Sequence, residues 1–190
     1  MGVPERVCSM IPLKKLRLLD AGCGAHRIEL NMTEEQRKLY EVHRCDIVLR
    51  GEWWKWEHKD NFRVVDLNAD WPYPTRFFDG VVAIEVIEHL ENPRHFFREA
   101  SRVAKEFIII TTPNLLSPYN RREFYEKGGF DWHNREKYLA ETAPLGHITP
   151  IFIWQIEQIC KDLGLKLEKV EYVDTGSKQD ILIAKIVIPC

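Results

Sequence analysis

The stretch LLDAGCGAHR, residues 18–27, decides the fold. An apolar run ends in Asp20, and two glycines, Gly22 and Gly24, follow one residue apart. Glycine permits both a tight turn and a close approach of the backbone to a ligand. This order of residues predicts a strand, a ligand-binding loop and then a helix.

The glycine pattern stops where a dinucleotide site would continue it. Dinucleotide-binding loops use a third glycine, so that the start of the following helix can approach a pyrophosphate. Position 27, where that glycine would stand, is Arg27. The loop therefore favours a nucleoside without phosphates, and it disfavours an NAD-dependent oxidoreductase.

Apolar runs alternate with helical patterns along the rest of the chain. This alternation predicts an α/β fold, and two nearly all-apolar runs indicate strands covered on both faces. The segments 165–173 and 180–188 predict an antiparallel hairpin at the edge of the sheet. The strand-like runs before them are residues 16–21, 41–48, 62–67, 78–86 and 106–112.

Two helices are readable from their ends. Asn92 suits an N-cap and Pro93 the first helical position. Thr149 and Pro150 predict the start of a later helix, which Gly164 ends. The predicted buried positions are Phe96, Phe97, Ala100, Val103 and Ala104 for the first, and Phe152, Ile156, Ile159, Cys160 and Leu163 for the second.

Two segments interrupt the alternation within what we expect to be a single domain over residues 1–190. Residues 49–61 carry Trp53, Trp54 and Trp56, and they are expected to cover the sheet where a crossover helix would otherwise lie. Residues 113–148 form a connection much longer than compact domains usually contain, and such connections are usually functional. We expect this insert to form a lid of one or two short helices.

The loop sequence Asp20-Ala21-Gly22-Cys23-Gly24 resembles the first motif of the class I S-adenosylmethionine-dependent methyltransferases. Residues 64–90 resemble the small ubiquinone-type, or methyltransferase-11-like, members, and residues 146–165 resemble their last helix more loosely. The resemblance implies S-adenosylmethionine as cofactor. It also implies a Rossmann-like doubly wound sheet of about seven strands, mostly parallel, with the antiparallel C-terminal hairpin.

The candidate cofactor residues follow the strand ends. Asp46, about twenty residues after the glycine loop, is placed to accept hydrogen bonds from both ribose hydroxyls. The resemblance implies that Asp66 accepts a hydrogen bond from the adenine amino group. Asp70 is then interpreted as an acid in a turn. The full set of cofactor-binding candidates is Asp20, Ala21, Gly22, Cys23, Gly24, Asp46, Ile47, Asp66, Leu67 (through its backbone) and Glu85, the last near the sulfonium or the amino group.

The candidate catalytic residue is His89, because imidazole has a near-neutral pKa and can act as a general base. The alternative is that His89 only bonds a backbone group and stabilises its loop. His147 has two interpretations, a residue facing the active site or a cap on the next helix. A cofactor that is already activated needs alignment and exclusion of water more than it needs a catalytic triad.

Composition limits the remaining classes. The net charge of −2 does not favour a nucleic-acid partner, and no apolar stretch is long enough to span a membrane. Five cysteines without a CxxC pair indicate reduced thiols, a cytoplasmic protein and no metal site. The expected partners are a small-molecule acceptor and a second copy in a homodimer, and similarity of residues 128–150 to methyltransferases of surface-polysaccharide systems ranks sugars first.

The alternative function is a non-catalytic S-adenosylmethionine-binding regulatory or scaffold protein. Two departures from the family pattern favour it. The N-terminal helices usual in the family are expected to be missing, and His26 stands where many members have a further glycine.

Overall fold

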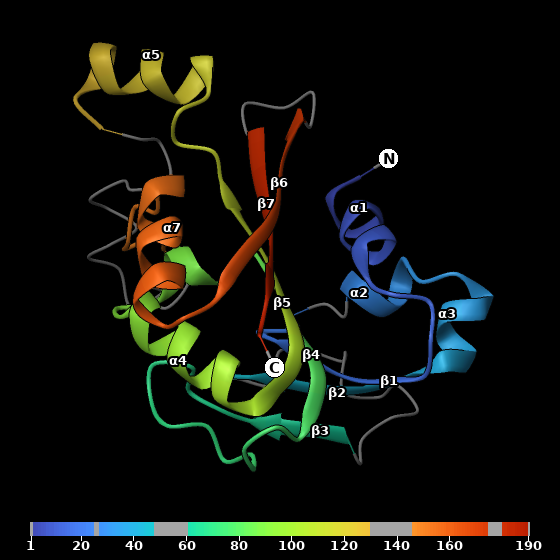
Figure 1. Ribbon diagram of the computed structural model, residues 1–190. Helices are drawn as coiled ribbons and strands as arrows, with labels where there is room; N and C mark the ends of the chain where they lie inside the picture. The colour runs from blue at the N-terminus through green and yellow to red at the C-terminus, as the bar shows by residue number, and fades with distance from the viewer. Residues whose placement is uncertain (1, 25–26, 48–60, 130–145, 175–179, 190) are drawn as a thin grey trace.

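The computed structural model describes residues 2–24, 27–47, 61–129, 146–174 and 180–189 (Figure 1). Within these residues a seven-stranded sheet has the order β3-β2-β1-β4-β5-β7-β6. The pairings among β1 to β5 are parallel, and β7 runs antiparallel to both β5 and β6. The predicted fold class is therefore confirmed. The strands are β1 (Leu16–Ala21), β2 (Tyr40–Asp46), β3 (Phe62–Val64), β4 (Phe78–Ile84), β5 (Ala104–Pro113), β6 (Lys166–Asp174) and β7 (Asp180–Val187).

Helices cover both faces of the sheet, and two buried clusters lie between them. Figure 1 shows α4 (Pro93–Val103) and α7 (Ile153–Asp162) on one side, and α1 (Val3–Met10), α2 (Arg27–Leu30) and α3 (Glu34–Leu39) on the other. Successive strand residues point to opposite faces. Along β4, accordingly, Val81 and Ala83 join the first cluster while Val82 and Ile84 join the second.

Helix α4 confirms its predicted start. The Asn92 side chain accepts a hydrogen bond from the His95 N–H at 3.1 Å, and Pro93 occupies the first turn. Its predicted apolar face is buried against the sheet, with Phe96 and Phe97 fully enclosed. Replacing either ring by alanine would cost about 3–5 kcal/mol of stability.

The predicted start of the later helix is wrong by several residues. Thr149 and Pro150 do not begin α7, which starts at Ile153 with Phe152 as N-cap. Thr149 is engaged elsewhere, because its N–H donates to the Glu88 carbonyl at 3.0 Å and its hydroxyl donates to the Leu90 carbonyl at 2.5 Å. The helical end is as predicted, since Gly164 adopts a φ of +68° just past it.

The expectation that the family's N-terminal helices are missing is wrong to the extent that one helix is present there. Helix α1 forms over Val3–Met10, and the Glu5 side chain accepts a hydrogen bond from the Gly2 N–H at its start. Val7 and Cys8 are buried in the second cluster, against α2 and the sheet. The helix buries Val7, Cys8 and Met10 and exposes Glu5, Arg6 and Ser9.

The edge strand β3 is shorter than the predicted run. Only Phe62–Val64 pair with β2, and both Arg63 and Val64 are exposed. From the long insert the structure describes α5 (Pro118–Lys127), which stands apart from the sheet after β5 (Figure 1). Residues 130–145 of the insert and the tryptophans at 53, 54 and 56 lie outside the described residues, as does His26.

Candidate active site

The carboxyl ends of β1, β2, β3 and β4 lie at one edge of the sheet because these strands are parallel. Ligands of open α/β sheets bind at this edge. The register pairs Ala21 with Cys45, so the glycine loop after β1 lies directly beside Asp46 at the end of β2. The predicted cofactor residues, which follow four different strands, thus lie together at the carboxyl end of the sheet.

The glycine loop is held by backbone hydrogen bonds to β2. The N–H groups of Gly22 and Cys23 both donate to the Cys45 carbonyl, at 2.8 and 3.0 Å. Gly22 has a φ of +71°, and a Cβ there would lie 2.6 Å from a methyl group of Val86. Only glycine satisfies both conditions, which explains why the sequence requires it at this position.

Asp46 orients the far side of the same loop. One carboxylate oxygen accepts from the Gly24 N–H at 2.9 Å, and the other accepts from the Ile47 N–H at 2.8 Å. Each carboxylate oxygen has a second lone pair, so the group keeps the capacity to accept from a ligand hydroxyl. Ile47 is 43% exposed and presents an apolar surface next to that carboxylate.

Asp20 of β1 and Cys23 of the loop are both buried. Asp20 is 3% exposed, and Cys23 is 4% exposed. Burial raises the pKa of the Cys23 thiol, and the negative charges of Asp20 and Asp46 raise it further. The cysteine is therefore a neutral packing residue, and the polar group beside the loop that this site contributes is the carboxylate of Asp46.

Asp66 and Leu67 follow β3 and are tied to the same edge. The Val65 N–H donates to the Asp46 carbonyl at 2.9 Å, which joins the two segments. The Asp66 side chain is exposed and accepts from the Asn68 N–H at 2.9 Å, whereas Leu67 is buried. The Asp70 side chain is 95% exposed and lies 3.5 Å from His95 of α4, as expected for a turn acid.

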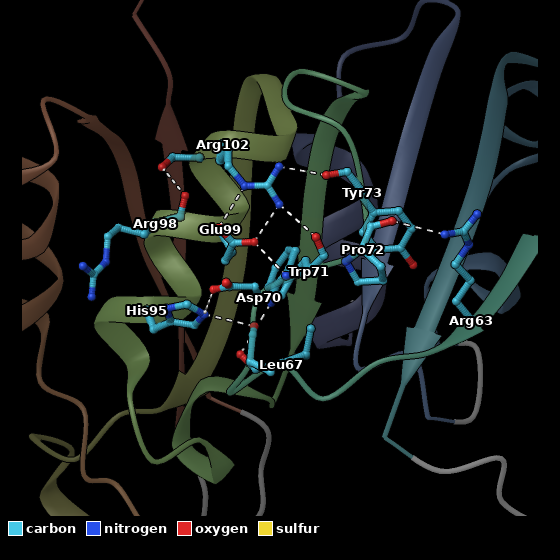
Figure 2. A network of polar contacts seen from close by, with 12 residues as sticks. Arg63, Leu67, Asp70, Trp71, Pro72, Tyr73, His95, Arg98, Glu99 and Arg102 are labelled. Carbon is cyan, nitrogen blue, oxygen red and sulfur yellow. Dashed lines mark hydrogen bonds and ion pairs between the residues drawn. The ribbon is translucent and has the colours of Figure 1, made fainter.

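A polar network on α4 anchors the segment that follows Asp66 (Figure 2). The Arg102 guanidinium donates to the carbonyls of Trp71 and Tyr73, at 3.0 and 2.8 Å, and to both carboxylate oxygens of Glu99. Glu99 in turn accepts from the Trp71 N–H at 2.8 Å. Sequence reasoning missed this pair, because nothing local indicates that two α4 side chains serve a loop about thirty residues earlier.

Glu85 adopts an unusual backbone conformation at the end of β4. Its φ is +55°, which is sparsely populated by residues with a Cβ. Two hydrogen bonds with the Thr111 hydroxyl hold it: the Glu85 N–H donates at 3.0 Å, and the hydroxyl donates to the Glu85 carboxylate at 2.8 Å. Strain of this kind clusters at functional sites.

His89 ends a short 3-10 helix over Ile87–His89 and lies against His147. Its Nδ1 is 3.0 Å from the Gly146 carbonyl oxygen, and the two imidazole rings meet edge to face with centroids 4.7 Å apart. His147 therefore lies with the candidate catalytic residue, and its interpretation as a helix cap is wrong because α7 begins at Ile153. The adjacent Glu88, 1% exposed, lies at the same strand end, and the sequence pattern assigned it no specific role.

The helix after the glycine loop has its own anchor. Arg44 of β2 is 3% exposed on its side chain, and its Nε donates to the Glu29 carboxylate of α2 at 2.6 Å. This ion pair fixes α2 on the sheet beside the loop. No sequence signal pairs these two residues, which lie on different elements.

Comparison with known proteins agrees with the fold. Residues 6–170 match the family model described as a methyltransferase domain. The chain therefore belongs to the methyltransferase-domain family, and the class I S-adenosylmethionine-dependent class that the loop motif indicated is confirmed, with S-adenosylmethionine as its cofactor.

One curated relative and two solved structures illustrate the similarity. The ajmaline N-methyltransferase of Rauvolfia serpentina is 36% identical over 104 residues, which are 49% of this chain and 34% of that protein, so the match spans about a third of the relative's length. The magnesium protoporphyrin IX methyltransferase of Synechocystis PCC 6803, with S-adenosylhomocysteine bound, superposes with a TM-score of 0.70 at 15% identity, covering 98% of this chain and 82% of the other. The 1,6-didemethyltoxoflavin-N1-methyltransferase of Burkholderia thailandensis gives 0.69 at 14% identity, covering 99% and 79%.

Proposed function

We propose that this chain transfers the methyl group of S-adenosylmethionine to a small-molecule acceptor, with sugars ranked first. The observation that supports this most strongly is the hydrogen bond from Gly24 to Asp46, which places the glycine loop beside an acid at the next strand end. A loop that lacks the third glycine and adjoins such an acid suits a nucleoside without phosphates.

Each candidate residue has a role in this proposal. Asp46 accepts from the ribose hydroxyls, and Asp66 accepts from the adenine amino group while the Leu67 backbone meets a ring nitrogen. Glu85 lies near the sulfonium or the amino group, where its charge favours a cation. Its hydrogen bonds with Thr111 support this role by holding the strained backbone at one position.

His89 is proposed as the general base. A carbonyl oxygen can only accept, so the contact with Gly146 requires a proton on Nδ1 and leaves Nε2 with a lone pair. In the transfer, a lone pair of the acceptor oxygen or nitrogen forms the bond to the methyl carbon. The carbon–sulfur bond breaks with its electrons moving to sulfur, and the acceptor's proton passes to Nε2.

The insert at about 113–148 is proposed to be a lid over the acceptor within a single domain. Its described helix α5 follows β5 at the ligand-binding edge of the sheet and exposes aromatic surface. Phe124 is 53% exposed and Tyr125 is 84% exposed, and Leu116 just before the helix is 53% exposed. Such a surface is suited to contact an acceptor or the rim of a closed site.

Two measurements test the proposed function. Calorimetric titration of the full chain with S-adenosylmethionine is expected to show one saturable site, and titration with NAD is expected to show none. A panel of sugar, amine and phenol acceptors is then screened for release of S-adenosylhomocysteine. Binding without release on any acceptor would favour the non-catalytic regulatory protein, and failure to bind the cofactor would refute both. Amines belong in the panel because the Rauvolfia relative is named an N-methyltransferase.

The cellular setting is part of the same proposal. Cys8, Cys23, Cys45 and Cys160 are buried free thiols, which is in keeping with the proposed cytoplasmic location. None of the helices in the described ranges is long and apolar enough to cross a membrane. The proposed homodimer is tested by native mass spectrometry of the full chain.

A further inference from the structure

Three side chains with metal-binding atoms converge beside the proposed active site. Glu88, His89 and His147 each place one such atom within 4.8 Å of the others. Two donors on a tetrahedral ion, each at about 2.1 Å, lie about 3.4 Å apart, so the widest spacing must close by up to about 1.4 Å when the ion binds. From this cluster we infer a binding site for a borderline divalent transition-metal ion, with Zn²⁺ as the first candidate.

The chemistry of the three donors selects the kind of ion. Imidazole suits zinc and its transition-metal neighbours, whereas Mg²⁺ and Ca²⁺ prefer all-oxygen sites. Two imidazoles and one carboxylate leave a tetrahedral ion with one open position, as in catalytic zinc sites. The expectation of no metal rested on the cysteine spacing, which says nothing of histidine and glutamate donors.

In this proposal Nε2 is the donor atom of His89. Nδ1 donates to the Gly146 carbonyl, so Nε2 carries the lone pair; in the metal-bound form that lone pair binds the ion, and His89 then does not act as the general base. Histidines that bind metals almost always donate their other ring N–H to a carbonyl or carboxylate, which fixes the ring and raises the basicity of the donor nitrogen. The Gly146 carbonyl supplies that outer contact here.

Backbone hydrogen bonds hold the two halves of the site together. The Glu88 carbonyl accepts from the N–H groups of Ile148 and Thr149, at 2.9 and 3.0 Å, and the Thr149 hydroxyl donates to the Leu90 carbonyl. The segment that carries His147 is thereby fixed against the segment that carries Glu88 and His89. A site assembled before the ion arrives avoids an ordering cost on binding.

The burial of Glu88 gives an electrostatic reason to expect a bound cation. Its side chain belongs to a residue that is 1% exposed, and a buried carboxylate is stabilised by a nearby cation. A divalent ion held by Glu88 and the two imidazoles supplies that charge. The open position of such an ion would be available to an acceptor hydroxyl.

Metal binding is tested without cofactor or acceptor, so its result is independent of the proposed methyl transfer. Chelator-treated full chain is titrated with Zn²⁺ and with Mg²⁺ by calorimetry, and with Co²⁺ by visible absorption. We expect one Zn²⁺ per chain, much weaker Mg²⁺ binding, and a Co²⁺ spectrum of nitrogen and oxygen ligation.

Single variants identify the ligands. Glu88→Gln, His89→Ala and His147→Ala are each expected to weaken Zn²⁺ binding by at least about a hundredfold, as loss of a ligand should exceed the loss of an outer contact. His43→Gln on β2 is the matched control and is expected to bind as the wild type does. Each variant is checked by circular dichroism, and Zn²⁺ should raise the Tm of the wild type but not of Glu88→Gln.

The inference is overturned if the wild type binds no more Zn²⁺ than the variants. It is equally overturned if His147→Ala binds and is stabilised as the wild type is, or if the Co²⁺ spectrum shows an intense thiolate charge-transfer band.

Discussion

Asp46 and Gly24 are joined by a hydrogen bond of 2.9 Å from the loop N–H to the carboxylate, across the ends of two neighbouring strands. The same carboxylate accepts from its neighbour Ile47 at 2.8 Å. The acid proposed to bind the ribose therefore also shapes the loop proposed to bind the nucleoside. Its removal should affect the site in two ways at once.

We expect Asp46→Ala to weaken binding of S-adenosylmethionine by at least about tenfold, because a lost charge-assisted hydrogen bond is worth about 1.5–3 kcal/mol. Calorimetry measures the affinity. Asp70→Ala is the matched control, since that carboxylate is almost fully exposed, and its affinity should stay that of the wild type. Equal affinities for Asp46→Ala and the wild type would contradict the ribose assignment.

Gly22→Ala should destabilise the protein by about 3 kcal/mol. The alanine must adopt a left-handed backbone conformation, which costs about 1–2 kcal/mol. Its methyl group must also displace Val86, which costs about 1–3 kcal/mol. Gly128→Ala is the control, because Gly128 has the same φ of +71° and open space around it. Urea unfolding should show the larger loss at Gly22, and similar losses at both positions would mean that the contact with Val86 relaxes freely.

Arg102→Lys should cost about 2 kcal/mol of stability, although the charge is kept. A lysine ammonium cannot bond Glu99 and the carbonyls of Trp71 and Tyr73 in the same planar arrangement, and a buried group left without its partner costs about 1–3 kcal/mol (Figure 2). Arg122→Lys, in an exposed pair with Glu126, is the control and should leave the urea midpoint nearly unchanged. If the urea midpoint of Arg102→Lys equals that of the wild type, the network contributes little to stability.

The same network predicts a pH dependence. Hydrogen bonds from Arg102 hold the pKa of Glu99 below its usual range. A lowered folded-state pKa stabilises the protein above the ordinary glutamate value of about 4.3, and that contribution is lost as the pH falls toward the folded value. The free energy of unfolding of Glu99→Gln should therefore fall less steeply below about pH 4.3 than that of the wild type. Parallel curves for the two proteins would exclude Glu99 as a source of the acid sensitivity.

The lid proposal is tested by limited proteolysis. Arg121 and Arg122 lie on the exposed part of α5 and offer trypsin sites. Cleavage there should slow several-fold when S-adenosylmethionine is bound together with an acceptor. Cleavage after Arg98 on α4 serves as the internal reference, and equal rates at α5 with and without ligands would contradict a lid.

Some features of this protein follow from local sequence alone. Gly22 and Gly24 after an apolar run determine a loop with a backbone conformation that other residues resist, and Asn92-Pro93 determines a helix start. Alternating apolar runs determine the α/β class, because a strand covered on both faces needs apolar residues throughout. These signals were readable because each depends on neighbours a few residues away.

Other features depend on tertiary structure. The start of α7 was mispredicted because Thr149 hydrogen-bonds with Leu90 instead of capping the helix. Helix α1 was missed because it is stabilised by the burial of Val7 and Cys8 against the rest of the fold. The convergence of Glu88 and His89 with His147, and of Arg102 with the loop at Trp71, joins residues far apart along the chain. Composition and spacing cannot encode such pairs, since only the packing of the strands and helices decides which distant side chains meet.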